Sequence, residues 1–360
     1  MKYEERSEME EKHQRRVRYK GTHPRNFKEK YKELQPDKYG DTIEKVIRKG
    51  GTPAGMHISI CVEEILQFLQ IQPGQKGLDA TLGYGGHSGR MLQCLKTDGT
   101  AVNGGHLYAL DVDPIEIVKT EERLRNMGYG EDILTILQMN FADIDKLSDQ
   151  VGKFDFVLAD LGVSSMQIDN PDRGFSYKTE GPLDLRLNPT KGISAAERLR
   201  TAGQQEIAGM LVENADEPYA REIAREVINT LKRGDRIDTT TQFRLVIEKA
   251  LEFLPAEERT EAVKKSCQRS FQALRIDVNN EYEVLYAFLE KLPNVLAPGG
   301  RAAILTFHSG EDRLVKKSFQ SLYKEGVYSD YSKEVIRPSA QECIRNSRAK
   351  STKMRWAVKA

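Results

Sequence analysis

Short apolar runs that are typical of strands alternate along this chain with segments of helical pattern, and this alternation constrains the fold most. The expected strands cover residues 77–80, 107–111, 133–139, 154–160 and 302–307, with a final strand over residues 354–358. Strands that alternate with helices are typical of a parallel sheet with helices on both faces. The sequence therefore predicts an α/β fold.

One block interrupts this alternation between the fourth and fifth strands. It opens with Ser194 and Glu197, which form a capping-box pattern. Apolar residues then recur at helical spacing over residues 220–231 and 243–254, with no strand between them. The sequence therefore predicts a basic N-terminal extension, an α/β domain in two segments and an inserted all-helical subdomain. These parts cover, in that order, residues 1–55, residues 56–190 with 268–360, and residues 191–267.

The charge of the chain is unevenly distributed. Residues 1–50 contain 15 Lys and Arg against 10 Asp and Glu, although the net charge of the whole chain is only +1. Six basic residues and no acidic ones follow Glu342. Basic ends on a near-neutral body are consistent with a nucleic acid partner, and equally with solubilising tails. The charge pattern leaves these two interpretations open.

Composition limits the cellular setting and the kinds of site. No apolar run approaches the roughly 18 residues of a membrane span, and the N-terminal residues lack the apolar core of a secretion signal. Four scattered cysteines form no disulfide scaffold and no thiolate zinc motif. His87, His106 and His308 have no metal-ligand spacing. We expect a cytoplasmic protein without a membrane partner or a metal site.

A glycine-rich loop follows the first expected strand. Asp79 ends that strand, and four glycines follow within ten residues. Glycines let the backbone approach a bound ligand closely. The dinucleotide fingerprint G-x-G-x-x-G would need glycine at Ser88, so a nicotinamide enzyme is disfavoured. An acid before such a loop suits an S-adenosyl-methionine site.

The next two strands also end in candidate nucleoside contacts. Asp113 precedes Pro114 and has the position of a helix N-cap. Asp111 is then free to accept hydrogen bonds from ribose hydroxyls, the alternative being an ordinary turn residue. Phe141 follows the third strand. Its ring either packs against an adenine ring or belongs to the hydrophobic core.

The fourth strand ends at Asp160, which a long loop follows. Ligands of open α/β sheets bind at the carboxyl ends of strands, and long ordered loops are commonly functional. The loop contains arginines and aromatic residues, namely Arg173, Phe175, Tyr177 and Arg186. The stretch around Asp160 is therefore the strongest candidate for the reacting end of a site.

The sequence resembles the RsmH (formerly MraW) family, the bacterial 16S ribosomal RNA cytosine-N4 methyltransferases. The resemblance covers roughly residues 55–360. The segments that carry it are HISICVEEIL from His57, DATLGYGGHS from Asp79, ALDVDP from Ala109, DLGVSSMQIDNPDRGFSYKTEGPLDLRLN from Asp160, RSFQALRIDVNNE from Arg269, LAPGGRAAILTFHSGEDRLVK from Leu296 and NSRAKSTKMR from Asn346.

The resemblance implies a class I S-adenosyl-methionine-dependent methyltransferase (Rossmann-like) fold, in which the helical insert is a family feature. Its substrate would be one cytosine, numbered 1402, in the decoding centre of 16S rRNA. The partner would be 16S rRNA, within the small ribosomal subunit; the oligomeric state, monomer or dimer, stays open. The resemblance implies cofactor contacts at Gly85, Gly86, His87, Asp111, Phe141, Asp160 and Gln167. We add Asp79 because of its position before the glycine loop.

The chemistry of the amine adds roles for the strand-end residues. The N4 amine of cytosine is a poor nucleophile, so hydrogen-bond acceptors must orient it. We expect Asp160, or a neighbouring carbonyl, to be that acceptor and the catalytic group. The flipped base could stack on Phe175 or Tyr177. We expect Arg173 and Arg186 to contact phosphates and His308 to form part of the pocket wall. Asp184 is a further expected substrate contact. For Arg275 two roles stay open, a contact with RNA and a structural ion pair.

The chain departs from the family pattern at Ser59, Met166 and Gly310. One alternative is therefore a diverged paralogue that methylates another RNA. A second is a non-catalytic ribosome-assembly factor that keeps the cofactor fold. A DNA amino-methyltransferase is disfavoured because Asp160 is followed by Leu161 rather than by Pro-Pro-Tyr.

Overall fold

The computed structural model describes residues 59–97, 100–101 and 105–360, so the expected basic extension over residues 1–55 lies outside the described residues. Its centre is a seven-stranded sheet. The strands are, in spatial order, β5 (Leu134–Gln138), β4 (His106–Asp111), β1 (Lys76–Asp79), β6 (Phe154–Asp160), β7 (Leu296–Thr306), β9 (Lys353–Lys359) and β8 (Tyr328–Tyr331). The first five run parallel, whereas β9 is antiparallel to β7 and to β8.

All six expected strands are present, which confirms the α/β prediction. The structure adds β8 and the small hairpin of β2 (Lys96–Thr97) and β3 (Thr100–Ala101). β8 has the sequence Tyr-Ser-Asp-Tyr, which lacks an apolar run, because it is an edge strand with one paired side. Strand pairing with β9, and not local sequence, therefore determines its presence.

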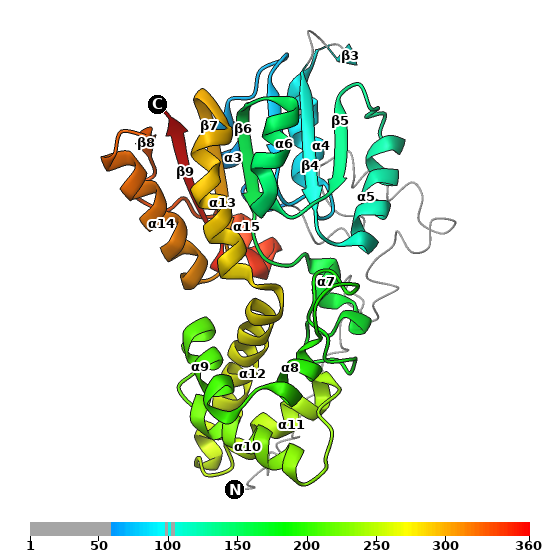
Figure 1. Ribbon diagram of the computed structural model, residues 1–360, viewed down its shortest axis with the longest axis vertical. Coiled ribbons are helices and arrows are strands. Elements are labelled where there is room, and N and C mark those ends of the chain that lie inside the picture. Colours follow the sequence, from blue (N-terminus) through cyan, green and yellow to red (C-terminus); the bar gives the residue numbers. More distant parts are fainter. Residues whose placement is uncertain (1–58, 98–99, 102–104) are drawn as a thin grey trace, which may run out of the picture.

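Helices cover both faces of the sheet, as the doubly wound, Rossmann-like class requires (Figure 1). Successive residues of β6 belong to opposite cores, Phe156 and Leu158 to one and Val157 and Ala159 to the other. On the first face lie α3 (Val62–Leu69), α4 (Gly86–Leu95) and α5 (Pro114–Asn126). On the second lie α6 (Ile144–Val151), α13 (Glu281–Val295) and α14 (Ser309–Lys324).

A helical lobe lies beyond one edge of this sandwich, below it in Figure 1. It contains α8 (Ala195–Thr201), α9 (Gln204–Ala215), α10 (Ala220–Lys232), α11 (Thr240–Ala250) and α12 (Ala256–Asn279). Their common apolar core also includes Phe175 and Leu185 from the long loop, and Leu274 from α12. α12 runs unbroken through residue 267, and this core also draws on residues before 191 and after 267, so the expected limits of the insert stay a prediction.

Short elements complete the connections near the carboxyl ends of the strands. They are η2 (Phe141–Asp143), α7 (Ser165–Asp169), η3 (Pro171–Arg173), α15 (Ala340–Arg345) and η4 (Ser347–Ser351). Within the described part of the chain, no helix has the length and apolarity that a bilayer crossing requires.

Candidate functional site

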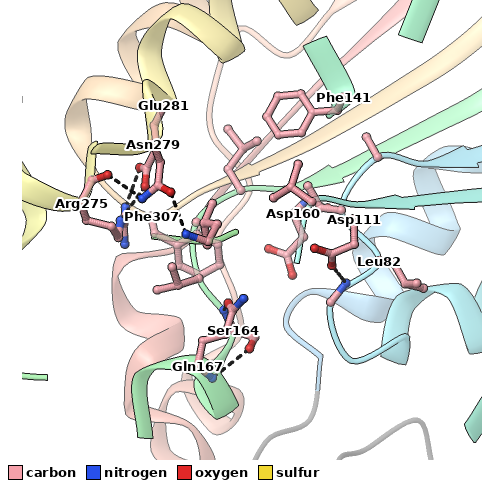
Figure 2. A pocket seen from close by; sticks show the side chains of 18 of the residues that line it. Leu82, Asp111, Phe141, Asp160, Ser164, Gln167, Arg275, Asn279, Glu281 and Phe307 are labelled. Carbon is pink, nitrogen blue, oxygen red and sulfur yellow. Dashed lines mark hydrogen bonds and ion pairs between the residues drawn. The ribbon is translucent and has the colours of Figure 1, made fainter. Parts of the chain in front are cut away.

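A cavity of about 820 Å³ opens where the parallel strands end. Its walls come from the glycine loop, from the residues that follow β4, β5 and β6, and from the junction of α12 with α13. Figure 2 shows the side chains of Asp111 and Asp160 close together, with Phe141 on one side and Arg275 and Glu281 on another. This is the location that open α/β sheets use for ligands.

The glycine loop is held in shape by buried contacts. Asp79 is buried, and its carboxylate accepts hydrogen bonds from Ser88 Oγ at 2.6 Å and from the Thr81 N–H at 3.2 Å. Gly85 has φ +78°, and a Cβ there would lie 2.8 Å from Thr120 Cγ2. Gly86 lines the cavity, but Asp79 and Gly85 do not. Asp79 and Gly85 shape the loop from behind the cavity lining, and their expected contact with the cofactor stays a prediction.

Asp111 occupies the position expected of a ribose-binding acid. Its Oδ2 accepts the Gly83 N–H at 2.8 Å, and its Oδ1 accepts the Asp113 N–H at 2.9 Å. Each oxygen keeps a second lone pair, and the residue lines the cavity. Burial raises the pKa of Asp111 to about 6. Asp113 is the N-cap of α5 as predicted, since its side chain accepts the Ile115 N–H at 2.9 Å.

Phe141 lies in η2, directly after β5, and also lines the cavity. Its ring packs edge-on against Phe288, with the ring centroids 5.1 Å apart. The hydrophobic core therefore supports Phe141 from one side. Phe141 thus combines a core contact with a position on the cavity wall, and its contact with an adenine ring stays a prediction.

Asp160 ends β6 with its carboxylate at the cavity. Its backbone N–H donates to Thr81 Oγ1 at 2.6 Å, which ties the strand end to the glycine loop. The side chain is 29% exposed, and its Oδ2 lies 3.5 Å from His87 Nδ1. Within the described residues, its Oδ1 is buried and accepts no hydrogen bond. Burial, together with the negative charge of Glu311, raises the pKa of Asp160 to about 7.

His87 and Gln167 line the same cavity, although their polar atoms are largely engaged. His87 Nε2 lies 3.0 Å from the Ile60 carbonyl oxygen, and burial lowers the pKa of the ring. Gln167 Oε1 accepts the Ser164 N–H at 2.8 Å, and Gln167 Nε2 donates to Asp113 Oδ2 at 2.7 Å. Gln167 thus joins α7 to the cap of α5.

The expected phosphate contacts Arg173 and Arg186 both form ion pairs within the chain, and their contact with RNA stays a prediction. Arg173 is buried, and its Nη1 lies 2.7 Å from Oδ2 of the fully buried Asp113. Removing one partner of a buried pair costs about 3–5 kcal/mol, because the other charge is left uncompensated. Arg186 donates to both carboxylate oxygens of Asp184, at 2.8 and 2.7 Å. None of these residues lines the cavity; both arginines hold the long loop in place.

The expected stacking and wall residues also lie outside the cavity lining, and their contact with the substrate stays a prediction. Phe175 is buried in the core of the helical lobe, and Tyr177 packs against that core, beside Phe271. His308 does not line the cavity, although its neighbours Phe307 and Glu311 do. His308 Nε2 lies 3.2 Å from Glu311 Oε1. His308 thus contacts a pocket residue from outside the pocket.

Sequence reasoning missed the acidic wall of the cavity. Glu281 and Glu311 line it from the first turns of α13 and α14, and Arg275 lines it from α12. Arg275 donates to both oxygens of Glu281, at 2.8 and 3.0 Å, so the ion-pair alternative for Arg275 is the observed one. The buried Glu311 accepts the Phe307 N–H at 2.9 Å. All three residues lie in segments that carry the family resemblance, and Arg275 was already a candidate, but their convergence on one cavity appears only in the folded chain.

Two clusters in the described chain offer three ligand atoms within 4.8 Å of one another: Cys61 with Glu64 and Glu342, and Glu281 with His308 and Glu311. In the second cluster, Arg275 already provides the positive charge for Glu281. Burial raises the pKa of the Cys61 thiol, which disfavours the thiolate that binds metals. Neither donor set is well prepared for a cation.

Comparison with known proteins agrees with the family resemblance of the sequence. Residues 54–360 match the model of the MraW methylase family. The chain is 72% identical over 348 residues to ribosomal RNA small subunit methyltransferase H 1 of Lachnoclostridium phytofermentans, covering 97% of this chain and 93% of that protein. It is 64% identical over 351 residues to ribosomal RNA small subunit methyltransferase H 2 of Alkaliphilus metalliredigens, covering 98% and 99%.

Among solved structures, the chain is similar to a SAM-dependent O-methyltransferase from Thermotoga maritima, with a TM-score of 0.37 and 10% identity. That alignment covers 83% of this chain and 64% of the Thermotoga chain.

Proposed function

The chain belongs to the MraW methylase family, and from this premise we propose that it methylates the N4 amine of cytosine 1402 in the decoding centre of 16S rRNA. Membership makes it an S-adenosyl-methionine-dependent methyltransferase of ribosomal RNA. The observation that carries the finer assignment is the Asp160 carboxylate, whose buried Oδ1 has no hydrogen-bond partner among the described residues and lies beside the Asp111 site.

The residues on the Asp111 side of the cavity fit the cofactor. Asp111 has lone pairs for two ribose hydroxyls, and Phe141 gives an aromatic surface for the adenine. Gly83 and Gly86 keep the loop backbone free of side chains where the ligand would approach. When bound, S-adenosyl-methionine supplies an activated methyl group together with its leaving group.

Asp160 is the residue that would act on the acceptor. An exocyclic amine must lose one proton when its nitrogen gains a methyl group. An ionised carboxylate in hydrogen-bond reach orients the N–H, directs the nitrogen lone pair and then accepts the proton. A pKa of about 7 leaves a large fraction of Asp160 ionised at neutral pH and still basic enough to take that proton.

The partner in this proposal is 16S rRNA, within the small ribosomal subunit. The names of both relatives specify small-subunit ribosomal RNA as their target. A ribosomal substrate would place the protein in the cytoplasm. The base must leave its stack to reach a cavity of this depth. The diverged-paralogue and assembly-factor alternatives predict different outcomes in the following experiment.

The test is transfer of labelled methyl from S-adenosyl-methionine to small ribosomal subunits from a strain that lacks this gene. We expect N4-methylcytosine at the decoding-centre position with the wild type, and a rate at least ~100-fold lower with Asp160→Asn. Asp172→Asn, an exposed acid in the following loop, is the matched control and should be unchanged.

Calorimetric titration with S-adenosyl-methionine accompanies the transfer assay. Cofactor binding without transfer to subunits would overturn the assignment. Transfer to a different RNA would then identify a paralogue, and no transfer to any RNA would identify an assembly factor.

A further inference from the structure

The cavity wall is acidic, which poses a problem for an RNA substrate. Among the residues that the structure describes, four contribute a carboxylate to the cavity lining: Asp111, Asp160, Glu281 and Glu311. Carboxylates suit an amine that donates hydrogen bonds, but they repel the phosphates on either side of the base. The Lys and Arg side chains that line the cavity in the described part of the chain are Lys191, Arg275 and Arg348.

Two of these three cations are already neutralised. Arg275 forms its bidentate pair with Glu281. Arg348 pairs with Asp169, at 2.8 Å from Nη2 to Oδ1 and at 3.4 Å from Nη1 to Oδ2. A guanidinium that serves a carboxylate in this way has little charge left for a phosphate.

Lys191 differs from both arginines. Its residue is exposed, and no carboxylate oxygen of the described chain lies within 4.0 Å of its Nζ. A lysine ammonium is a compact charge with three donors, which suits a phosphate whose exact position varies. Lys191 is thus the cavity-lining Lys or Arg whose charge is available to a ligand.

The turn that carries Lys191 is fixed next to the cavity. The Lys191 N–H donates to the Asn188 carbonyl at 3.2 Å, and Asn188 Oδ1 accepts the Thr190 N–H at 3.0 Å. Just before it, the Leu187 N–H donates to Asn279 Oδ1 of α12 at 2.7 Å. This anchoring limits the entropy that Lys191 would lose when it binds a ligand.

We propose that Lys191 binds a phosphate of the RNA next to the target base. The substrate then enters with its backbone at the Lys191 end of the cavity and its amine at Asp160. This inference rests on the proposed function, and it specifies the orientation of the substrate in the cavity. Arg173 and Arg186, the phosphate contacts expected from sequence, are replaced in that role by a lysine from the same loop.

The test measures KM and kcat for small ribosomal subunits at several salt concentrations, with Lys191→Ala and Lys191→Arg. Lys178→Ala is the matched control, since Lys178 is exposed in the same loop but does not line the cavity. For Lys191→Ala we expect KM to rise about tenfold at low salt, and the slope of log KM against log salt to fall by about 0.7 to 0.9.

The same experiment should leave kcat and the cofactor Kd of Lys191→Ala unchanged, and Lys191→Arg should restore most of the lost affinity. An unchanged KM and salt slope would overturn the proposal. So would an equal effect of Lys178→Ala, which would show a diffuse surface charge, or a fall in kcat at constant KM.

Binding of the subunits is also measured directly, without turnover, by retention on filters. Wild type that binds subunits but does not methylate them would count against the proposed function alone. In that event, weaker binding by Lys191→Ala, and not by Lys178→Ala, would still support the phosphate contact, whereas equal binding would contradict it.

Discussion

The cavity has two halves that are built in different ways. The cofactor half consists of the glycine loop, Asp111 and Phe141, each of which directly follows a strand of the sheet. The acceptor half consists of Asp160, the acidic wall and Lys191, and it combines β6, a loop, α12, α13 and α14. The first half repeats one local motif, whereas the second exists only where distant segments meet.

The two halves also treat their carboxylates differently. Both oxygens of Asp111 accept backbone N–H groups, which fixes the side chain in one orientation. Among the described residues, no backbone N–H donates to the carboxylate of Asp160, and Glu311 adds a second negative charge nearby. A carboxylate that is fixed by backbone hydrogen bonds is suited to binding a ligand. A carboxylate without such hydrogen bonds is suited to accepting a proton. Substitutions should therefore separate cofactor affinity from turnover.

Among the substitutions that separate the two halves further, the largest effect is expected from Asp111→Asn in the cofactor half. The amide can accept at only one of its two positions, so one backbone N–H and one ribose hydroxyl lose an acceptor. We expect the Kd for S-adenosyl-methionine to rise about 100-fold, because a ribose hydrogen bond to a charged group is worth about 1.5–3 kcal/mol and the glycine loop also loses one of its anchors. Calorimetric titration measures this, with the exposed Glu131→Gln as control.

The affinity of Asp111→Asn for small subunits should stay at the wild-type value. An equal loss of RNA and cofactor affinity would contradict the division of the cavity into two halves.

A smaller effect is expected from pH in the acceptor half. Because the pKa of Asp160 is raised to about 7 and the ionised form accepts the proton, kcat should rise through neutral pH and level off above it. At pH 6 only about a tenth of Asp160 is ionised, so kcat should be about tenfold below its plateau.

Glu311→Gln tests the cause of that shift. It removes a negative charge that raises the pKa of Asp160, although burial, the larger cause, remains. The glutamine can still accept the Phe307 N–H. We expect kcat at pH 6, relative to pH 8, to rise about threefold. Measured at constant ionic strength, an unchanged profile would refute the coupling; the exposed Glu283→Gln should change nothing.

The smallest effect is expected from Gly310→Ala, at one of the positions that depart from the family pattern. A Cβ at Gly310 would overlap the Tyr282 hydroxyl and lie 2.9 Å from Tyr282 Cζ. The tyrosine must then move, and it loses its 3.4 Å contact with the Asn214 carbonyl of the helical lobe. The shift disturbs the neighbouring Glu281 and Glu311.

We expect kcat to fall about threefold in Gly310→Ala, a loss of under 1 kcal/mol, at unchanged cofactor Kd. Gly209→Ala is the control, since a Cβ there meets no atom within 4 Å. A Tyr282→Ala background should abolish the effect of Gly310→Ala. A lasting effect in that background would show that the overlap with Tyr282 is not the cause.

Local sequence specifies six of the seven strands of the sheet, all except β8, and most of the cofactor half. Alternating strand and helix patterns specify β1, β4, β5, β6 and β7, and the pair Asp113-Pro114 specifies the start of α5. These signals are local: periodicity and caps act within a few residues, so they can be read without knowing the fold. Asp111 and Asp160 follow from them, because strand ends meet at one edge of a parallel sheet.

Only the tertiary structure decided which charges are free. Arg173, Arg186 and Lys191 belong to one loop and look alike as cations in the sequence, but Asp113 lies 60 residues from Arg173 and neutralises it in the interior. The turn of Lys191 is likewise fixed beside α12 by a bond between residues 92 apart. An ion pair depends on the distance between two charges in space. Folding brings together residues that are far apart along the chain, so their separation in sequence does not show whether they pair.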